Sequence, residues 1–501
     1  MGRAGMWRRV LVVAVLVGAC SGGEAGTAER PGRTAGPGER AGDEGPFDAY
    51  GGSTAVDLEA TGWFRTEEVG GRWWLVTPDG HPFWSAGVNG VRPTGTTDRD
   101  GGTPYAEAVA AAYGSDEAWA DAQVARFQDW GVTTLGGWGE EALPLFAERV
   151  PSTYVLDLAR DVDDEGRFAW ADLWDEGWAD GARAEIARVT AAHRDDPWLV
   201  GWFTDNEMPW GMGISGEGLV TMFDLDLARP PGSPGKEALL AFLRHRYGDD
   251  LSRLAADFPA LNATTWDELA TPRDPVLLAT TQGGKDTQVA YATAVAERYF
   301  SVVGPALAEA DPHHLDLGVR FVAVATPRPV LEVAARSVDV VSVNFYEMTP
   351  SFDQAVIDLS DGIPLAGTRD TLAGFGAAGK PVLVSEFGYR AADAGLPNTS
   401  PAIFTTLPTQ AERARALRNY GRCLLDTSYV VGAHWFLHAD QPAIGRADGE
   451  DQNLGLVDIE DRPYEEVTTV LAGLHDEAYA RLSPTADPLP CTPVGTQATP
   501  G

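Results

Sequence analysis

Cysteine, basic residues and long apolar runs are all scarce in this sequence. It has 3 cysteines among 501 residues, Cys20, Cys423 and Cys491, so it is not a small fold held by a disulfide framework. Its 38 Lys and Arg face 73 Asp and Glu, which gives a formal net charge of −35. Because the phosphates of nucleic acids require a basic surface, this balance argues against nucleic acid as a partner.

The acidic balance and the histidines also limit the kinds of ligand that the protein is expected to bind. A negative surface repels polyanions and favours a neutral ligand such as an uncharged glycan, although solubility alone explains the charge equally well. The 16 tryptophans suit a glycan too, because the apolar face of a sugar stacks on indole, but most are expected in the core. The 8 histidines show no spacing typical of zinc, and we expect no metal and no cofactor.

The N-terminus has the features of an export signal. Basic residues precede an apolar run at 10–17 that is too short to cross a bilayer as a helix. Small residues, Gly18 and Ala19, then precede Cys20, which resembles the bacterial lipoprotein signal with its lipidated cysteine. We expect an exported protein anchored to the membrane through lipid on Cys20. The alternative is that the signal peptide is an ordinary cleaved one, that Cys20 is there by chance and that the protein is secreted.

Composition divides the chain into four parts. Residues 1–20 form the predicted signal peptide, and residues 21–45 have almost no bulky apolar side chains, which predicts a disordered tether. Residues 46–483 are expected to form one large domain, and the proline-rich residues 484–501 a flexible tail. Cys423 and Cys491 remain as a pair able to form a disulfide in an exported protein, or Cys423 is simply a buried apolar residue.

Within 46–483, short apolar runs alternate with stretches of helical period, the pattern of repeated β-α units around a parallel sheet. Helices are predicted at 116–130, 177–193, 286–309 and 410–425. The apolar runs are eight, at 83–88, 131–135, 153–158, 199–203, 315–321, 338–343, 382–385 and 430–436. This count predicts an α/β fold of the TIM (β/α)8 barrel type. An open doubly wound sheet is the alternative, but the first run is not followed by a GxGxxG phosphate loop.

The stretch 208–314 is too long for a simple loop and helix. Its apolar spacing predicts helices at 236–247 and 249–258. We therefore expect a helical insertion after the fourth strand, standing over the mouth of the barrel.

Two glutamates end apolar runs in the same way. The fourth run leads into Asp205-Asn206-Glu207, and the seventh into Ser385-Glu386. In a barrel, the C-terminal ends of all strands face one mouth, so these glutamates can converge. Hydrolysis of a glycoside needs such a pair, one protonated carboxyl to donate to the leaving oxygen and one ionised carboxylate to attack the anomeric carbon.

The order of these motifs resembles the superfamily of retaining TIM-barrel glycosidases, and the β-agarase branch in particular. The segments that carry the resemblance are 201–210, 317–321, 341–346, 432–436, 453–458 and 461–464. The resemblance implies that Glu207 is the acid/base and Glu386 the nucleophile. It also implies that Asn206 binds the sugar 2-hydroxyl, that Tyr346 contacts the nucleophile and that Trp435 floors the cleavage subsite.

Several other residues are candidates for the site. Arg320, in an apolar run, is a costly buried charge unless it pairs, and Glu386 is its natural partner. Asn89, at the first strand end, binds substrate or only caps a turn, and His434 is a candidate contact to sugar hydroxyls although a single histidine is more often structural. For Asp205 we favour a bond to neighbouring backbone. Weaker substrate-contact candidates are His438, Asp440, Glu450 and Asn453.

The sequence thus predicts a retaining glycoside hydrolase that cleaves a β-linked neutral polysaccharide or oligosaccharide by double displacement. The resemblance favours an agarose-type galactan. One alternative is a glycan-binding surface lipoprotein without turnover, and the other is a glycosidase for a different β-galactoside, mannoside or glucoside. A barrel lyase or isomerase would normally need a metal cluster or a phosphate-binding loop, and the sequence has neither pattern. Nothing in the sequence indicates an oligomeric state, or whether cleavage is endo or exo.

Overall fold

A computed structural model describes residues 45–162, 168–215, 218–248, 250–277, 279–347, 368–400, 404, 406–483 and 485–490. The predicted signal peptide, nearly all of the predicted tether and most of the predicted tail lie outside these ranges, as do Cys20 and Cys491. In the part that is described, no helix is both long and apolar enough to span a membrane.

The centre of the molecule is a nine-stranded sheet in which every neighbouring pair runs parallel. Each strand overlaps one of the eight predicted apolar runs, so those predictions are confirmed. In chain order the strands are β4 (Ser85–Val88), β5 (Thr134–Leu135), β6 (Ser152–Val155), β9 (Leu199–Phe203), β12 (Leu315–Asp316), β13 (Phe321–Val322), β14 (Val341–Asn344), β15 (Val382–Phe387) and β18 (Val430–Trp435).

The order of the strands shows that the sheet curls. It runs β12-β9-β6-β5-β4-β18-β15-β14-β13, so the two edge strands, β12 and β13, both come from the fifth predicted run. Only residues 317–320 separate them. An extended chain covers at most about 18 Å in that interval, so the two edges of the sheet must approach each other. Within the interval, Leu317 N donates to Trp202 O at 2.9 Å, and Arg320 N donates to Ser342 Oγ at 2.9 Å.

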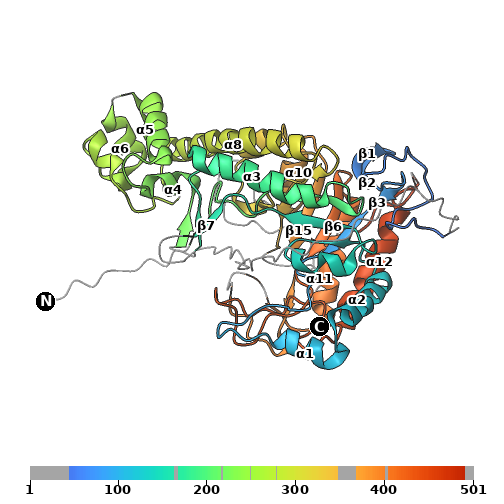
Figure 1. Ribbon diagram of the computed structural model, residues 1–501. Coiled ribbons are helices and arrows are strands. Elements are labelled where there is room, and N and C mark those ends of the chain that lie inside the picture. Colours follow the sequence, from blue (N-terminus) through green and yellow to red (C-terminus); the bar gives the residue numbers. More distant parts are fainter. Residues whose placement is uncertain are drawn as a thin grey trace, which may run out of the picture.

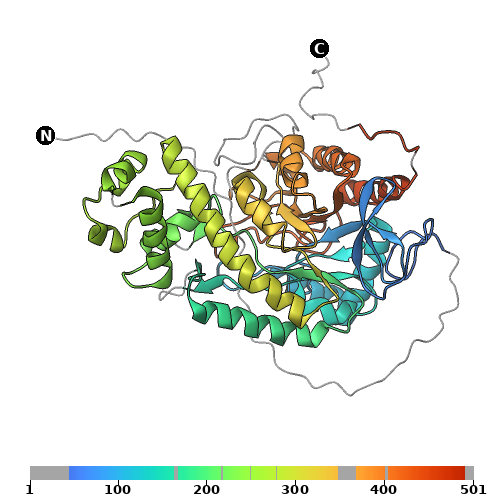
Figure 2. The same cartoon turned by 90° about the horizontal axis from the view of Figure 1, so that it is seen from above.

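Helices pack around the sheet (Figures 1 and 2). The predicted helix 116–130 is confirmed, because Ser115 caps its first turn by accepting from Ala118 N and Gly131 ends it in the left-handed conformation. The α-helices that cover the sheet are α1 (Pro104–Tyr113), α2 (Asp116–Trp130), α3 (Glu176–His193), α8 (Gln282–Ala310), α9 (Arg328–Ala334), α10 (Thr368–Gly376), α11 (Gln410–Asp426) and α12 (Glu465–Ala480). Short 3-10 helices lie at η1 (Glu140–Phe146), η2 (Pro259–Leu261), η3 (Ala323–Ala325) and η4 (Ala392–Ala394).

Four further helices follow β9 in the chain and gather at one end of the molecule, around the N-terminal part of the long α8 (Figure 2). They are α4 (Met222–Ala228), α5 (Pro234–Tyr247), α6 (Leu251–Asp257) and α7 (Trp266–Ala270). The helices predicted at 236–247 and 249–258 correspond to α5 and α6. That they cover the barrel mouth stays a prediction.

Small β elements, which the sequence pattern did not predict, border the sheet. β1 (Arg65–Val69), β2 (Arg72–Val76) and β3 (Pro82–Phe83) form an antiparallel meander. Its Phe64, Leu75 and Phe83 side chains join one apolar cluster with Val200 of β9 and Leu383 of β15. The meander thus packs against the interior of the curled sheet. Two-stranded pairs are β7 (Arg160–Val162) with β8 (Phe168–Trp170), β10 (Gly213–Ser215) with β11 (Gly218–Val220), and β16 (Arg390–Ala391) with β17 (Thr406–Leu407).

Candidate active site

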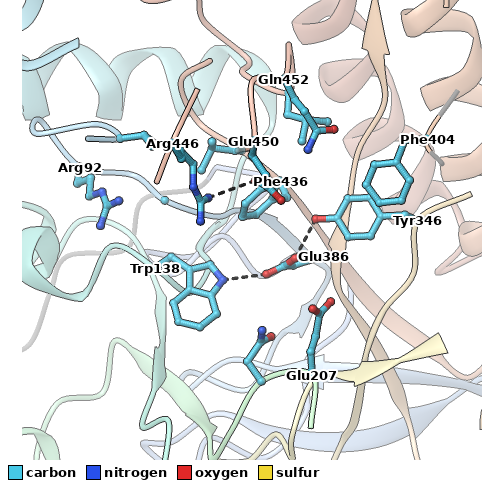
Figure 3. A pocket seen from close by; sticks show the side chains of 15 residues that line it. Arg92, Trp138, Glu207, Tyr346, Glu386, Phe404, Phe436, Arg446, Glu450 and Gln452 are labelled. Atoms are coloured by element: carbon cyan, nitrogen blue, oxygen red, sulfur yellow. Dashed lines mark hydrogen bonds and ion pairs between the residues drawn. The ribbon is translucent and has the colours of Figure 1, made fainter. Parts of the chain in front are cut away.

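A pocket lies where the C-terminal ends of the parallel strands converge (Figure 3). Its volume is about 620 Å³, including space open to solvent. Residues after six of the strands contribute to its wall. The lining residues are Gly90, Arg92, Thr96, Trp138, Asn206, Glu207, Tyr346, Glu386, Phe404, Phe436, Leu437, Arg446, Glu450, Gln452 and Leu454.

Glu207 lines the pocket four residues after the end of β9, next to Asn206. Its backbone is in the left-handed region (φ 52°), which is strained for a residue with a side chain, and its N–H donates to Arg320 O at 3.3 Å. Asn344 Nδ2 donates to Glu207 Oε1 and to Asn206 Oδ1, both at 3.0 Å. Burial, followed by the nearby Glu386 carboxylate, raises the pKa of Glu207 to about 8. This rise in pKa favours the protonated form of Glu207 at neutral pH.

Glu386 lies in β15 and faces Glu207 across the same pocket (Figure 3). Three donors from three other parts of the chain reach its carboxyl. Trp138 Nε1 donates to Oε1 at 2.8 Å, and Tyr346 OH donates to Oε2 at 2.8 Å. Arg320 Nη2 forms an ion pair with Oε1 at 2.8 Å. This surrounding of donors is complementary to a carboxylate, which only accepts.

Arg320 is fully buried, yet its charge is compensated. Its Nη2 also donates to Asn89 Oδ1 and to Ser385 O, both at 3.0 Å, and its guanidinium lies 5.1 Å from the ring centres of Trp138 and Phe203. The ion pair with Glu386 that the sequence predicted is present. The carboxylate pairs with the buried charge, but all of these polar contacts fall on Nη2, and among the described residues Nε and Nη1 have no hydrogen-bond partner.

The sequence resembles those of two β-agarases. No family model matches the sequence. The chain is 30% identical to Beta-agarase A and 27% identical to Beta-agarase B of Vibrio sp. (strain JT0107), over 79% and 86% of its length. It spans about half the length of these curated relatives, 44% of the first and 50% of the second.

Solved structures show the same fold. The agarase AgWH50C superimposes with a TM-score of 0.69 at 26% identity, covering 87% of this chain and 68% of that chain. PfGH50B (TM-score 0.69, 24% identity) and an exo-beta-agarase (TM-score 0.68, 24% identity) each match 87% of this chain and 69% and 67% of theirs. The chain is β-agarase-like. This likeness confirms the resemblance that the motifs indicated.

In this β-agarase-like chain, four predicted site residues lie outside the pocket wall: Asn89, Arg320, His434 and Trp435. His434 is fully buried with its Nε2 2.8 Å from Ser85 Oγ, and burial together with Arg320 lowers its pKa to about 3. Trp435 is also buried, donates from Nε1 to Leu454 O at 2.8 Å and stacks under the Arg413 guanidinium at 5.2 Å. Successive residues of a strand point to opposite faces, so one side chain enters the interior of the sheet and the other faces the outer helices. At this strand end, the aromatic side chain that lines the pocket is that of the next residue, Phe436.

Asn89 and Asp205 support the site from behind. Asn89 Nδ2 donates to Ser385 O at 3.0 Å and to Trp435 O at 3.2 Å, so its amide joins three strand ends rather than facing the pocket. Asp205 Oδ1 accepts from Ala159 N at 2.9 Å, which confirms the predicted backbone contact, and Oδ2 accepts from Tyr299 OH at 2.5 Å.

Among the weaker candidates, one reaches the pocket and three do not. Glu450 lines it. In the loop that follows β18, Asn453 Nδ2 donates to Asp440 Oδ1 at 2.9 Å. His438 is buried, with its Nε2 3.2 Å from Gln123 Oε1. These three side chains are structural in this conformation.

The sequence reasoning missed Trp138, although a signal for it existed. Trp138 follows the second predicted run, as Glu207 follows the fourth, and strand ends in a barrel face the mouth. Its backbone has φ 69° and its N–H donates to the buried Glu140 Oε1 at 3.1 Å, which also accepts from Val155 N at 3.1 Å. The other missed residues sit on loops without periodicity: Arg92, Thr96, Phe404, Arg446 and Gln452.

Proposed function

We propose that the protein is a retaining glycoside hydrolase that cleaves a β-linked neutral glycan. One observation carries the proposal: a protonated Glu207 and a donor-surrounded Glu386 face each other in one pocket (Figure 3). The double-displacement reaction requires one carboxyl able to give a proton, which the raised pKa of Glu207 favours, and one carboxylate nucleophile, which the donors around Glu386 suit.

In the first step, Glu386 attacks the anomeric carbon while Glu207 gives its proton to the leaving glycosidic oxygen. The glycosidic bond breaks and an ester bond to Glu386 forms. In the second step, the Glu207 carboxylate takes a proton from water as the water oxygen attacks the same carbon, and Glu386 leaves as a carboxylate. Asn206, beside the acid, is positioned to bind the sugar 2-hydroxyl. Tyr346, Trp138 and Arg320 hold the nucleophile by the three donors described above.

The substrate we propose first is a β-linked galactan of the agarose type. The relatives named above are agarases, and the pocket contains aromatic side chains, Trp138, Tyr346 and Phe436, on which sugar faces can stack. Another β-galactoside, a mannoside or a glucoside is the alternative. Hydrolysis assays on agarose, galactan, mannan and glucan oligosaccharides test this choice, and inactivity on agarose alone would redirect the substrate but not the mechanism.

The mechanism has a direct test in Glu207→Gln and Glu386→Gly. We expect Glu207→Gln to retain glycosylation only with activated aryl leaving groups, and azide to rescue Glu386→Gly by giving a glycosyl azide of inverted configuration. Proton NMR of the wild-type product should show retention at the anomeric carbon. Inversion would overturn the nucleophile role of Glu386. Unchanged product release by Glu207→Gln would instead favour a glycan-binding protein without turnover.

For the architecture, we propose that the curled sheet is one closed TIM (β/α)8 barrel within residues 46–483, with α4 to α7 as an insertion after its fourth strand. The single segment that carries both edge strands supports closure. A crystal structure with the interval 317–320 hydrogen-bonded to both neighbouring strands along its length would bear this out.

We also propose export and lipid anchoring through Cys20, which rests on the sequence signal. Radiolabelled palmitate or mass spectrometry of the expressed protein tests it, and an unmodified Cys20 would leave secretion as the alternative. Cys423 is disulfide-bonded, in keeping with an oxidising compartment.

A further inference from the structure

The pocket contains a third acidic side chain, Glu450, on the loop that follows β18. Glu450 is 4% exposed and lines the pocket. Among the described residues, both contacts of its carboxyl fall on Oε2, from Gln441 Nε2 at 2.5 Å and from Arg446 Nη1 at 3.3 Å. A carboxylate has lone pairs on both oxygens, so Oε1 remains able to accept a hydrogen bond from a ligand.

Gln452, two positions further along the same loop, offers the complementary group. Its Oε1 accepts from Arg390 Nη1 at 3.2 Å, which fixes the orientation of the amide. In the described part of the chain its Nε2 has no hydrogen-bond partner, and the residue lines the pocket. The loop therefore presents one open acceptor and one open donor to the same space.

The position of Glu450 and Gln452 indicates on which side of the scissile bond they lie. Figure 3 shows Glu450 and Gln452 beyond Glu386, on the side away from Glu207. Burial raises the pKa of Glu450 to about 7, and the nearby carboxylates of Asp448 and Glu386 add to that rise. In the reaction proposed above, Glu207 protonates the departing sugar, while the sugar that stays behind is held over Glu386.

We propose that Glu450 and Gln452 form a hydroxyl-binding subsite for the glycone sugar, the one that becomes attached to Glu386. This inference rests on the proposed glycosidase function. A sugar hydroxyl both donates and accepts, so an acceptor on Glu450 and a donor on Gln452 match one hydroxyl or two adjacent ones.

The subsite predicts a kinetic pattern that separates it from a contact to the leaving group. The glycone is present in both steps, so losing its contacts slows glycosylation and deglycosylation together. We expect Glu450→Gln and Gln452→Met to slow each step by roughly 10- to 100-fold, a loss typical of removed hydrogen bonds to charged or buried partners. Rapid-quench measurement with an activated aryl β-glycoside gives the two rates separately.

Asp448→Asn is the matched control. Asp448 lies on the same loop and binds the same arginine, Arg446 Nη2, at 2.6 Å, but it is not part of the pocket wall. We expect both of its rates to stay within about twofold of wild type, because Asn keeps the Oδ1 that accepts from Glu450 N at 3.2 Å and the variant loses a partly exposed ion pair. Thermal unfolding of all three variants, with midpoints close to wild type, shows that the loop is folded.

Deoxy substrates give a second readout. The wild type should discriminate strongly against the aryl glycoside that lacks the recognised hydroxyl, and Glu450→Gln should lose most of that discrimination at one hydroxyl position only. Equal discrimination by wild type and Glu450→Gln at every position, or slowing of glycosylation alone, would overturn the subsite. A wild type that forms no glycosyl-enzyme with any β-glycoside would defeat the proposed function itself.

Discussion

Arg320 Nη2 and Glu386 Oε1 form an ion pair at 2.8 Å in which the guanidinium is entirely buried and the carboxylate reaches the pocket. A buried cation of this kind fixes the position of the carboxylate and stabilises its charge. Replacing Arg320 by Met removes the charge and leaves Glu386 with two donors. We expect kcat to fall on the order of 100-fold or more, as for the loss of one strong donor at a charged reacting group.

Arg320→Lys distinguishes charge from geometry. The compact ammonium of Lys keeps the charge but cannot reach Asn89 Oδ1, Ser385 O and Glu386 together, as the planar guanidinium does. In steady-state kinetics, the kcat of Arg320→Lys should be closer to that of Arg320→Met than to that of the wild type. Recovery of most of the activity would show that charge alone is sufficient.

The pH profile should report the proton on Glu207. Because the pKa of Glu207 is raised to about 8, kcat/KM is expected to fall above that pH as the acid loses its proton. With an activated leaving group that needs no acid, Glu207→Gln should lack this alkaline limb. A limb that persists at the same pH in the variant would assign it to another group.

The same proton links folding to pH. Between the ordinary pKa of 4.5 and the folded value of about 8, the folded chain holds a proton that the unfolded chain releases. The stability contributed by Glu207 is therefore full below pH 4.5 and is lost as the pH rises to about 8. Relative to wild type, Glu207→Gln should gain unfolding free energy steadily over this window, measured by denaturant titrations at several pH values. A pH-independent difference would contradict the buried, protonated state.

The donors on Glu386 can be removed one at a time. Tyr346→Phe deletes the 2.8 Å bond to Oε2 and keeps the ring stacked on Phe404, whose ring centre is 5.0 Å away. Trp138→Phe deletes the 2.8 Å bond to Oε1 and keeps an aromatic surface. We expect each to lower kcat by roughly 10- to 100-fold with a small change in KM, because the lost bonds act on the nucleophile. A rise in KM without loss of kcat would mean that the rings serve mainly to bind sugar.

Trp435 and Phe436 should separate stability from activity. Trp435 is buried beneath Arg413, so Trp435→Phe should lower the unfolding free energy by about 1–3 kcal/mol and change kcat/KM little. Phe436 lines the pocket, so Phe436→Ala should raise KM while stability changes less. The opposite pattern would restore Trp435 as the floor of the cleavage subsite.

The strands were predictable because each is buried on both faces and reads as a continuous apolar run, as in β9 and β15. The two glutamates followed from the same rule, since a charged residue that ends such a run lies at the strand end. The division of the fifth run into β12 and β13 was not predictable, because it depends on which neighbour each half pairs with.

The pocket was only partly predictable. Trp435 was predicted from the resemblance and His434 as a candidate contact to sugar hydroxyls, but the register of β18 turns one side chain inward and the other outward. Loop residues such as Phe404 and Gln452 carry no periodic signal. Their place in the site depends on tertiary contacts, for example that of Gln452 with Arg390.

The segment that joins the two edges of the sheet has a consequence for how the protein matures. Arg320 O accepts from the Glu207 backbone N–H, and the Arg320 guanidinium holds Glu386. Arg320, in the segment that links the two edges of the sheet, thus contacts the backbone of Glu207 and the carboxyl of Glu386. A chain whose halves have folded separately has no opposed pair of acids, so assembly of the sheet and the onset of chemistry are a single event. The proposed active site is therefore incomplete until the last strands of the sheet are in place.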